Sequence, residues 1–226
     1  MIKKGLLIII SGFSGTGKGT AIKKLLELYP NDYCLSISAT TRNPREGEVH
    51  GREYFFKTKE DFEEMIMKQE LIEYTQYVDN YYGTPKEYVE DQMDAGHNII
   101  LEIEIDGALN VKKLYPDALL IFLLPPSIKE LEKRLRERGT ESEDVIADRI
   151  KRASEESKVI REYDYVVVND ILDDAVDKVD AIIKAEKCRV DRIEEVFLDT
   201  KEEEIHELLM MEDKEFINKS ISEKIN

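Results

Sequence analysis

A glycine-rich stretch near the start of the chain contains the residues best suited to chemistry. Its spacing, G-x-x-x-x-G-K from Gly12 to Lys18, follows an apolar run and precedes a helical pattern, as a Walker A phosphate-binding motif requires. Glycines let the backbone curl so that successive N–H groups face phosphate oxygens, and the next helix adds the positive end of its dipole. Lys18 supplies a mobile charge for the β- and γ-phosphates of a nucleoside triphosphate. We therefore expect a triphosphate site made by Gly12, Phe13, Ser14, Gly15, Thr16, Gly17, Lys18, Gly19 and Thr20.

One position of this motif is unusual. Gly19 stands where most such loops have the Ser or Thr that ligates Mg²⁺, and Thr20, one position later, is expected to face a phosphate instead. Because Mg²⁺ gives up its water reluctantly, we expect nucleotide phosphates and water to hold it, and the sequence names no protein ligand for the metal.

A second basic cluster lies in the segment from Ser36 to Phe56. Arg42 and Arg45 are three residues apart and offer two planar forks that suit one phosphate monoester. Tyr54 and Tyr82 can donate phenolic hydroxyls to the same oxygens. Surface ion pairs are the alternative, since loop arginines in an acidic protein often form them.

Acidic and basic side chains recur in two later segments. In Leu101–Gly107, strand alternation would place Glu102, Glu104 and Asp106 on one face, where they repel unless a cation or a donor-rich ligand is present. Between Glu130 and Ile160, arginines recur at helical spacing. Arg134 and Arg138 share a helix face, and Arg149 lies on the next helix. Arginines on a mobile segment can neutralise a transferring phosphoryl group and exclude water.

The elements that must position these residues alternate along the chain. Strands expected from short apolar runs are Leu6–Ile10, Ile99–Ile105, Leu119–Leu124 and Tyr165–Val168. Helices expected from apolar spacing are Thr20–Leu28, Ala108–Leu114, Ile128–Arg138, Val145–Ile160 and Leu172–Ala185. Near-continuous apolar strands that alternate with helices predict an α/β fold with a parallel sheet covered on both faces. Residues 33–96 differ, with aromatic β-prone pieces around a helical segment at Lys59–Met67, and predict an inserted α+β subdomain.

Composition limits the possible partners and location. The net charge of −16 disfavours nucleic acid as a partner, so any phosphate site must be a local basic pocket. Two distant cysteines and three scattered histidines indicate neither a disulfide framework nor a zinc site. The first apolar run is only six residues long, and no stretch approaches the ~20 residues of a membrane span. We expect a soluble, cytoplasmic protein that does not bind membranes.

The segment from Ser36 to Phe56, the glycine-rich loop and Asn80–Thr84 together resemble the guanylate kinase family. The resemblance runs from about Lys4 to Lys187 and includes several separate motifs in the family's order. It implies a P-loop NTPase-type parallel sheet flanked by helices, with an inserted GMP-binding subdomain and a helical lid. The implied division is a core of residues 4–32, 97–129 and 161–187, a GMP-binding subdomain of residues 33–96, a lid of residues 130–160, and an acidic helical or flexible tail at 188–226.

The resemblance also implies a role for each motif residue. Arg42, Arg45, Tyr54 and Tyr82 match the positions that hold the GMP phosphate. The guanine is read by residues matching Ser38, Glu73 and Thr84, because a carboxylate accepts from its N1–H and 2-amino group. Glu102 and Glu104 match acidic positions beside GMP and the magnesium-bearing phosphates, and Asn169 matches a position near adenine. Catalytic positions are matched by Lys18, Arg134, Arg138 and Arg149.

Two departures from the family pattern stand out. Asp106 replaces the usual Gln, and Arg136 and Arg152 lack a family match, so we expect these two arginines to be solvated or paired with glutamates.

The implied activity is ATP-dependent phosphorylation of GMP to GDP with Mg²⁺. No general base is expected, because the attacking phosphate is already ionised near pH 7. Two alternatives remain: a nucleoside-monophosphate kinase with another acceptor base, and a guanylate-kinase-like binding module without catalysis. The sequence leaves the oligomeric state open. A nucleic-acid-binding ATPase conflicts with the net charge of −16.

Overall fold

The computed structural model describes residues 4–139 and 142–192. The chain divides into two units, Met1–Glu186 and Lys187–Asn226. In the second unit the described residues include a short 3-10 helix, η2 (Val190–Arg192). The predicted acidic tail lies outside the described residues from residue 193 onward. Among the described residues, no helix is long and apolar enough to cross a membrane.

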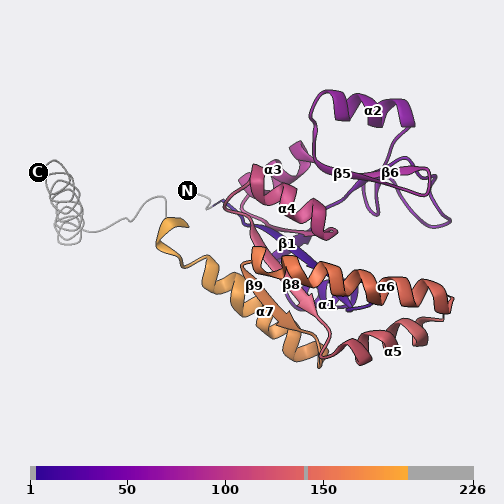
Figure 1. The fold of residues 1–226 in the computed structure, drawn as a ribbon. Coiled ribbons are helices and arrows are strands. Elements are labelled where there is room, and N and C mark those ends of the chain that lie inside the picture. The colour runs from indigo at the N-terminus through magenta and orange to yellow at the C-terminus, as the bar shows by residue number, and fades with distance from the viewer. Residues whose placement is uncertain (1–3, 140–141, 193–226) are drawn as a thin grey trace, which may run out of the picture. The chain divides into compact units, whose positions relative to one another are not determined.

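A five-stranded parallel sheet forms the centre of the first unit (Figure 1). Its strand order is β2-β7-β1-β8-β9. Its strands are β1 (Leu7–Gly12), β2 (Tyr33–Leu35), β7 (Asn98–Glu102), β8 (Leu119–Leu124) and β9 (Tyr165–Val168). The four predicted apolar strands are confirmed here: β8 and β9 have the predicted bounds, and the ends of β1 and β7 shift by one to three residues. β2 pairs with β7 in this sheet, so the core sheet extends past the boundary that the sequence placed before residue 33.

Helices cover both faces of this sheet, as the apolar strands predict. Alternation along β1 places Leu7 and Ile9 in one apolar cluster and Ile8 and Ile10 in the other. The Ile8 face packs against α1 (Lys18–Leu28) and α7 (Leu172–Glu186). The opposite face packs against α3 (Lys86–Asp94), α4 (Ile105–Leu114), α5 (Ile128–Arg138) and α6 (Glu143–Glu156).

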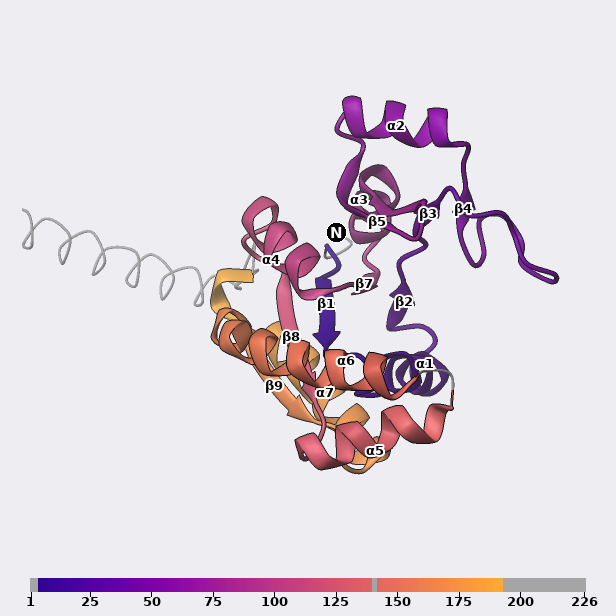
Figure 2. The ribbon, with the colours of Figure 1, turned by 45° about the vertical axis from the view of Figure 1, so that its right-hand side comes forward.

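The inserted segment forms a second sheet beside α2 and α3 (Figure 2). This sheet has four strands in the order β4-β3-β6-β5. Its elements are β3 (Ala39–Thr40), β4 (Phe55–Phe56), α2 (Lys59–Met67), β5 (Leu71–Tyr77) and β6 (Asn80–Pro85). The predicted helix is confirmed at both ends. Thr58 caps it by accepting a hydrogen bond from the Asp61 amide, and Phe62 anchors it by stacking on Tyr81 at 5.2 Å between ring centroids.

The predicted helix over Val145–Ile160 is interrupted. α6 ends at Glu156 and a 3-10 helix, η1 (Ser157–Glu162), continues the chain toward β9. At the start of α5, the Ser127 hydroxyl accepts a hydrogen bond from the Glu130 amide over 3.1 Å and so caps the helix.

The expected strand over Leu101–Gly107 is wrong beyond its second residue. β7 ends at Glu102, Glu104 precedes the first residue of α4, and Asp106 lies in the first turn of that helix. Glu102, Glu104 and Asp106 therefore do not share a strand face. This segment forms a helix because Ile105, Ala108 and Val111 are then all buried on one side of α4. An acidic residue in the first turn also interacts favourably with the helix dipole.

Candidate active site

The glycine-rich loop connects β1 to α1, as its motif predicts. Gly15 and Gly17 have φ angles of +91° and +86°, which favour glycine. A Cβ on Gly15 would lie 2.8 Å from a methyl of Leu135, so α5 packs directly against this loop. The buried Thr16 hydroxyl donates to the Phe13 carbonyl over 2.9 Å, which fixes the curl of the loop.

Lys18 begins α1 and folds back over the loop. Its Nζ donates to the Gly12 carbonyl at 2.6 Å and lies 3.4 Å from the Phe13 carbonyl oxygen. The ammonium group is thus held at the mouth of the loop, where it can bind phosphate oxygens in place of these carbonyls.

The Glu102 carboxylate lies beside Gly19, the unusual position of the motif. A Cβ on Gly19 would be 3.6 Å from both carboxylate oxygens. The pKa of Glu102 is raised, mainly because the carboxylate is buried. The charge of Glu104 adds to this rise, and the positive charge of Lys18 opposes it. Among the residues that the structure describes, no group of three His, Cys, Asp or Glu side chains is arranged to hold a metal ion.

Asn169, directly after β9, contacts the loop from the other side. Its Nδ2 donates to the Thr16 carbonyl over 2.8 Å, and its side chain would be 2.8 Å from a Cβ on Gly17. Arg134 on α5 donates through Nη1 to the Asn169 carbonyl over 3.0 Å and through Nε to Glu130 over 3.1 Å. Arg134 and Asn169, both predicted for the triphosphate side, are therefore joined by a hydrogen bond.

The other two predicted lid arginines, Arg138 and Arg149, are placed differently. Arg149 on α6 donates a hydrogen bond to the Ser14 hydroxyl, so it reaches the glycine-rich loop. Arg138 is exposed at the end of α5. Arg136 forms ion pairs with Glu132 and Glu143, as expected for an arginine without a family match.

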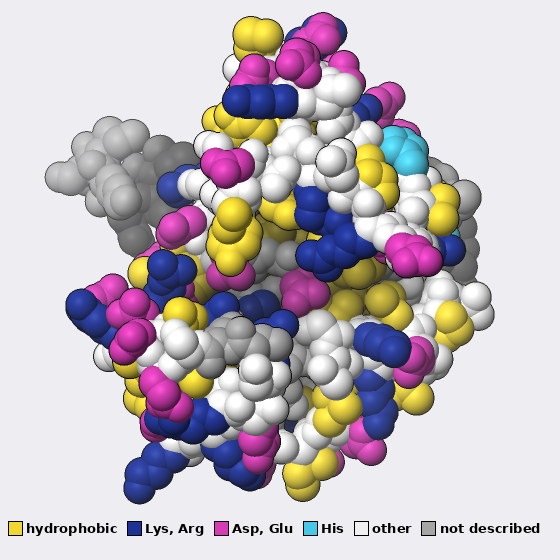
Figure 3. Space-filling view, turned by 90° about the vertical axis from the view of Figure 1, so that its right-hand side faces the viewer, with side chains coloured by type: hydrophobic (Ala, Val, Ile, Leu, Met, Phe, Trp, Pro, Cys, Tyr) yellow, Lys and Arg dark blue, Asp and Glu magenta, His cyan; other side chains and the backbone are white. Residues whose placement is uncertain are grey.

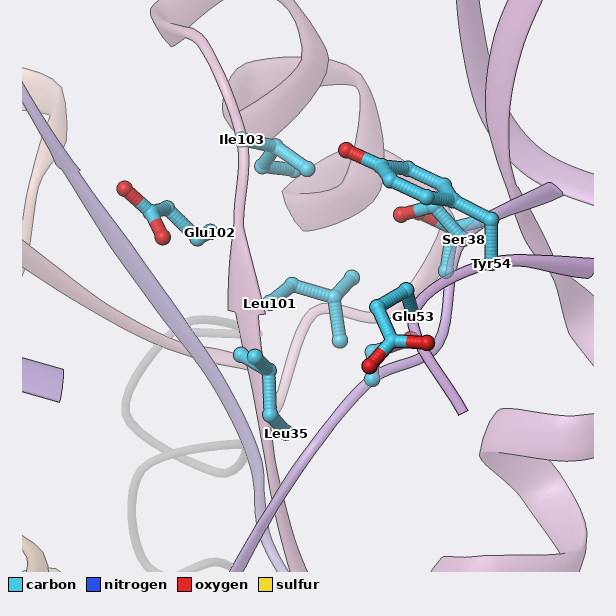
Figure 4. A pocket seen from close by; sticks show the side chains of 9 residues that line it. Leu35, Ser38, Glu53, Tyr54, Leu101, Glu102 and Ile103 are labelled. Atoms are coloured by element: carbon cyan, nitrogen blue, oxygen red, sulfur yellow. The ribbon is translucent and has the colours of Figure 1, made fainter. Parts of the chain in front are cut away.

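A pocket lies between the ends of the core strands β2 and β7 and the second sheet (Figure 4). It has a volume of about 130 Å³ and includes the predicted residues Ser38, Tyr54, Thr84 and Glu102. Sequence reasoning missed two polar residues of its lining, Ser36 and Glu53.

Thr84 and Glu73 form a hydrogen-bonded pair near this pocket. Thr84 Oγ1 donates to Glu73 Oε1 over 2.7 Å, and Thr84 is buried. Burial raises the pKa of Glu73, and the hydrogen bond from Thr84 opposes that rise. A Cβ on Gly107 would be 3.2 Å from Glu73 Oε2, so glycine at that position leaves room for the carboxylate. A half-buried carboxylate beside a hydroxyl suits a ligand edge with two N–H donors.

Arg42, Tyr54 and Tyr82 gather on the second sheet. The Arg42 guanidinium lies 5.4 Å from the centroid of the Tyr54 ring, and the Tyr54 and Tyr82 rings are 6.1 Å apart. Arg42 also donates to Glu48 over 2.9 Å, so it forms an ion pair within its own loop. Sequence reasoning missed Glu48, although its position three residues after Arg45 was a usable signal.

One face of the molecule is hollowed, and Lys and Arg side chains gather around the hollow (Figure 3). Such a local basic concentration in a chain of net charge −16 can attract phosphate groups.

A phosphate loop at the end of a central parallel strand, arginines on a neighbouring helix pair and a polar acceptor pocket define a P-loop nucleoside-monophosphate kinase. Residues 4–186 match the family model described as guanylate kinase. The chain belongs to the guanylate kinase family.

Individual relatives agree with this membership. The chain is 52% identical over 203 residues to a guanylate kinase of Caldanaerobacter subterraneus subsp. tengcongensis, covering 90% of this chain and 98% of the relative. It is 51% identical over 208 residues to a guanylate kinase of Clostridium tetani, covering 92% and 99%. The crystal structure of guanylate kinase from Anaplasma phagocytophilum matches with a TM-score of 0.65 at 30% identity, over 84% of this chain and 90% of that one.

Proposed function

We propose that this chain transfers the γ-phosphoryl group of ATP to GMP, giving ADP and GDP. The observation that carries the proposal is the Glu73–Thr84 pair, with its 2.7 Å hydrogen bond, in a chain that also has a complete phosphate loop. A carboxylate and a hydroxyl at this place can bind the N1–H and 2-amino group of guanine, whereas adenine lacks that donor edge.

The ATP side is assigned to the loop residues and their neighbours. Residues 12–20 bind the phosphates through their backbone N–H groups, Lys18 binds the β- and γ-phosphates, and Asn169 lies beside the adenine. Arg134, Arg138 and Arg149 neutralise the charge on the transferring group. The bond between Ser14 and Arg149 supports a lid that can reach the loop.

The GMP side is assigned to the second sheet and the pocket. Arg42, Arg45, Tyr54 and Tyr82 bind the phosphate, and Ser38 joins Glu73 and Thr84 at the base. Glu102 and Glu104 lie between the two nucleotides. The proposed division is a core of residues 4–32, 97–129 and 161–187 to which the edge strand β2 also belongs, with residues 33–96 otherwise forming a GMP-binding subdomain, residues 130–160 a lid and residues 188–226 a tail.

Mg²⁺ fits this site as a cofactor that is bound mainly by ATP phosphates and water. Glu102 is the protein group best placed to contact its water shell, since its carboxylate lies beside Gly19, where other loops carry a metal-binding hydroxyl. When bound, the ion supplies positive charge to the β- and γ-phosphates.

In the reaction, an oxygen of the GMP phosphate forms a bond to the γ-phosphorus of ATP while the bond to the bridging oxygen of ADP breaks. No proton must be removed from the nucleophile, because a phosphate monoester is largely ionised near pH 7. The protein acts by holding the two phosphates in line and by surrounding the transferring group with Lys18 and the lid arginines.

A coupled assay of ADP release, with ATP and Mg²⁺ and with GMP, AMP, UMP or CMP as separate acceptors, tests the proposal. ADP release with GMP alone is expected. Release with another nucleotide would assign a different acceptor base. GMP binding without any release would assign a binding module instead.

A further inference from the structure

The loop between β3 and β4 carries both arginines proposed for the GMP phosphate, and it also carries Glu48. One carboxylate oxygen of Glu48 accepts from Arg42 Nη2 over 2.9 Å. The other accepts from the backbone N–H of Arg45 over 2.7 Å. A single side chain is therefore bonded to both arginine residues, to the guanidinium of one and to the backbone of the other.

The backbone supports this arrangement. The Glu48 amide donates to the Arg45 carbonyl over 3.1 Å, and Gly47 between them has a φ of +86°, which favours glycine. Glu48 and Arg45 thus bond in both directions across one turn. The hydrogen bond from the Arg45 backbone, followed by that from Arg42, lowers the pKa of Glu48, so the carboxylate is ionised at neutral pH.

Arg42 is held on three sides but keeps donors for a ligand. Besides the bond to Glu48, its Nη1 donates to the Asn43 carbonyl over 2.7 Å and its plane lies over Tyr54. The Arg42 side chain is only 16% exposed. A guanidinium has five N–H donors, and these two hydrogen bonds use two of them. The remaining donors can bind a phosphate while Glu48 keeps its own contact.

We propose that Glu48 is a positioning residue of the GMP phosphate site, which holds the Arg42 guanidinium and the Arg45 turn in the arrangement that binds a phosphate monoester. The inference rests on the proposed function, because it takes the Arg42 and Arg45 loop as the acceptor-phosphate site. Removing the carboxylate frees a long side chain that must then be ordered by the ligand, and this loss weakens phosphate binding.

Binding of GMP and of guanosine, measured by calorimetry on the full chain, separates this role from others. Guanosine lacks the phosphate and reports the base pocket alone. Glu48→Ala is expected to raise the Kd for GMP about 10- to 100-fold, the cost of misplacing a binding group, and to leave the Kd for guanosine unchanged. Glu48→Gln keeps an acceptor for the Arg45 N–H but loses the charge, so a smaller rise is expected. Glu46→Gln is the matched control, because Glu46 is an exposed carboxylate of the same loop.

Kinetics give a second readout. In the Glu48 variants, KM for GMP should rise while kcat and KM for ATP stay within about twofold, since the ATP side is untouched. An unchanged Kd for GMP would overturn the inference. A lower Kd would overturn it too, because it would mean that the carboxylate competes with the phosphate. An equal rise in the Kd for guanosine would overturn it as well, because the substitution would then act on the base pocket and not on the phosphate site. Failure of the unaltered chain to phosphorylate GMP would instead count against the proposed function, while the binding comparison still tests Glu48.

Discussion

The side-chain amide of Asn169 donates a hydrogen bond to the Thr16 carbonyl over 2.8 Å and so joins the end of β9 to the phosphate loop. The Asn169 carbonyl in turn accepts from Arg134 on α5 over 3.0 Å. One residue therefore connects the loop proposed to bind the triphosphate to the helix that carries two of the proposed catalytic arginines.

Asn169→Ala should weaken both the fold and the triphosphate site. Asn169 is only 5% exposed, so its loss leaves the Thr16 carbonyl without that partner, at a cost of about 1–3 kcal/mol in the free energy of unfolding. Urea unfolding measures this change, and KM for ATP should rise more than KM for GMP. Asp170→Ala, at the next and exposed position, serves as the control. Equal stability of the Asn169 and Asp170 variants would show that the hydrogen bond contributes nothing.

Gly19→Ser should reduce the Mg²⁺ concentration needed for half-maximal activity. The site has room, since a Cβ there meets only the Glu102 oxygens at 3.6 Å, and a serine hydroxyl would add a ligand that this loop lacks. Gly19→Ala is the matched variant, because it adds the same Cβ without the hydroxyl. Both variants should also stabilise α1 slightly, by up to about 1 kcal/mol. If alanine changed the Mg²⁺ requirement as much as serine, the hydroxyl would not be the cause.

Glu73→Gln should affect folding and binding in opposite directions. Burial raises the pKa of Glu73 above its usual 4.5, so the folded chain binds more protons than the unfolded chain just above that pH. The contribution of Glu73 to the free energy of unfolding therefore falls as pH rises through this window. The stability of Glu73→Gln relative to the unaltered chain should thus increase from pH 4.5 to pH 7. Urea unfolding at several pH values measures it, and a constant difference would argue against a buried ionised carboxylate.

In the same variant, GMP should bind about 10- to 100-fold more weakly, because a charged hydrogen-bond acceptor has been lost. Calorimetry at pH 7 measures this loss, and KM for ATP should not change.

Arg138→Ala should lower kcat far more than it changes nucleotide affinity. Its side chain is exposed, so its removal should leave thermal stability intact. Loss of one group that neutralises the transferring phosphoryl group is expected to reduce kcat about 10²- to 10³-fold. Arg136→Ala is the control, since Arg136 bonds Glu132 over 2.8 Å and has no proposed role. Steady-state kinetics of the two variants decide the matter, and a kcat for Arg138→Ala equal to that for Arg136→Ala would remove Arg138 from catalysis.

The sequence predicted the core sheet well, because buried parallel strands are continuous apolar runs that differ clearly from their helical neighbours. The predicted end of β7 was wrong, because the spacing of Ile103 and Ile105 is compatible with either a strand or a helix in so short a segment. Only packing decides that Ile105 belongs to α4. The Glu48 contacts were missed for another reason. The spacing of Glu48 from Arg45 was a usable signal, but the contacts themselves depend on the turn at Gly47.

Thr16 and its partner Asn169 are separated by 153 residues, so the phosphate loop is completed by a residue made long after it. On a ribosome that adds ~5–20 residues per second, the loop would wait roughly 8 to 30 s for that hydrogen bond. A nascent chain that ends before β9 would thus carry the whole Walker A sequence without its finished support. Measuring ATP binding by ribosome-bound chains of increasing length would identify the chain length at which the triphosphate site first becomes functional.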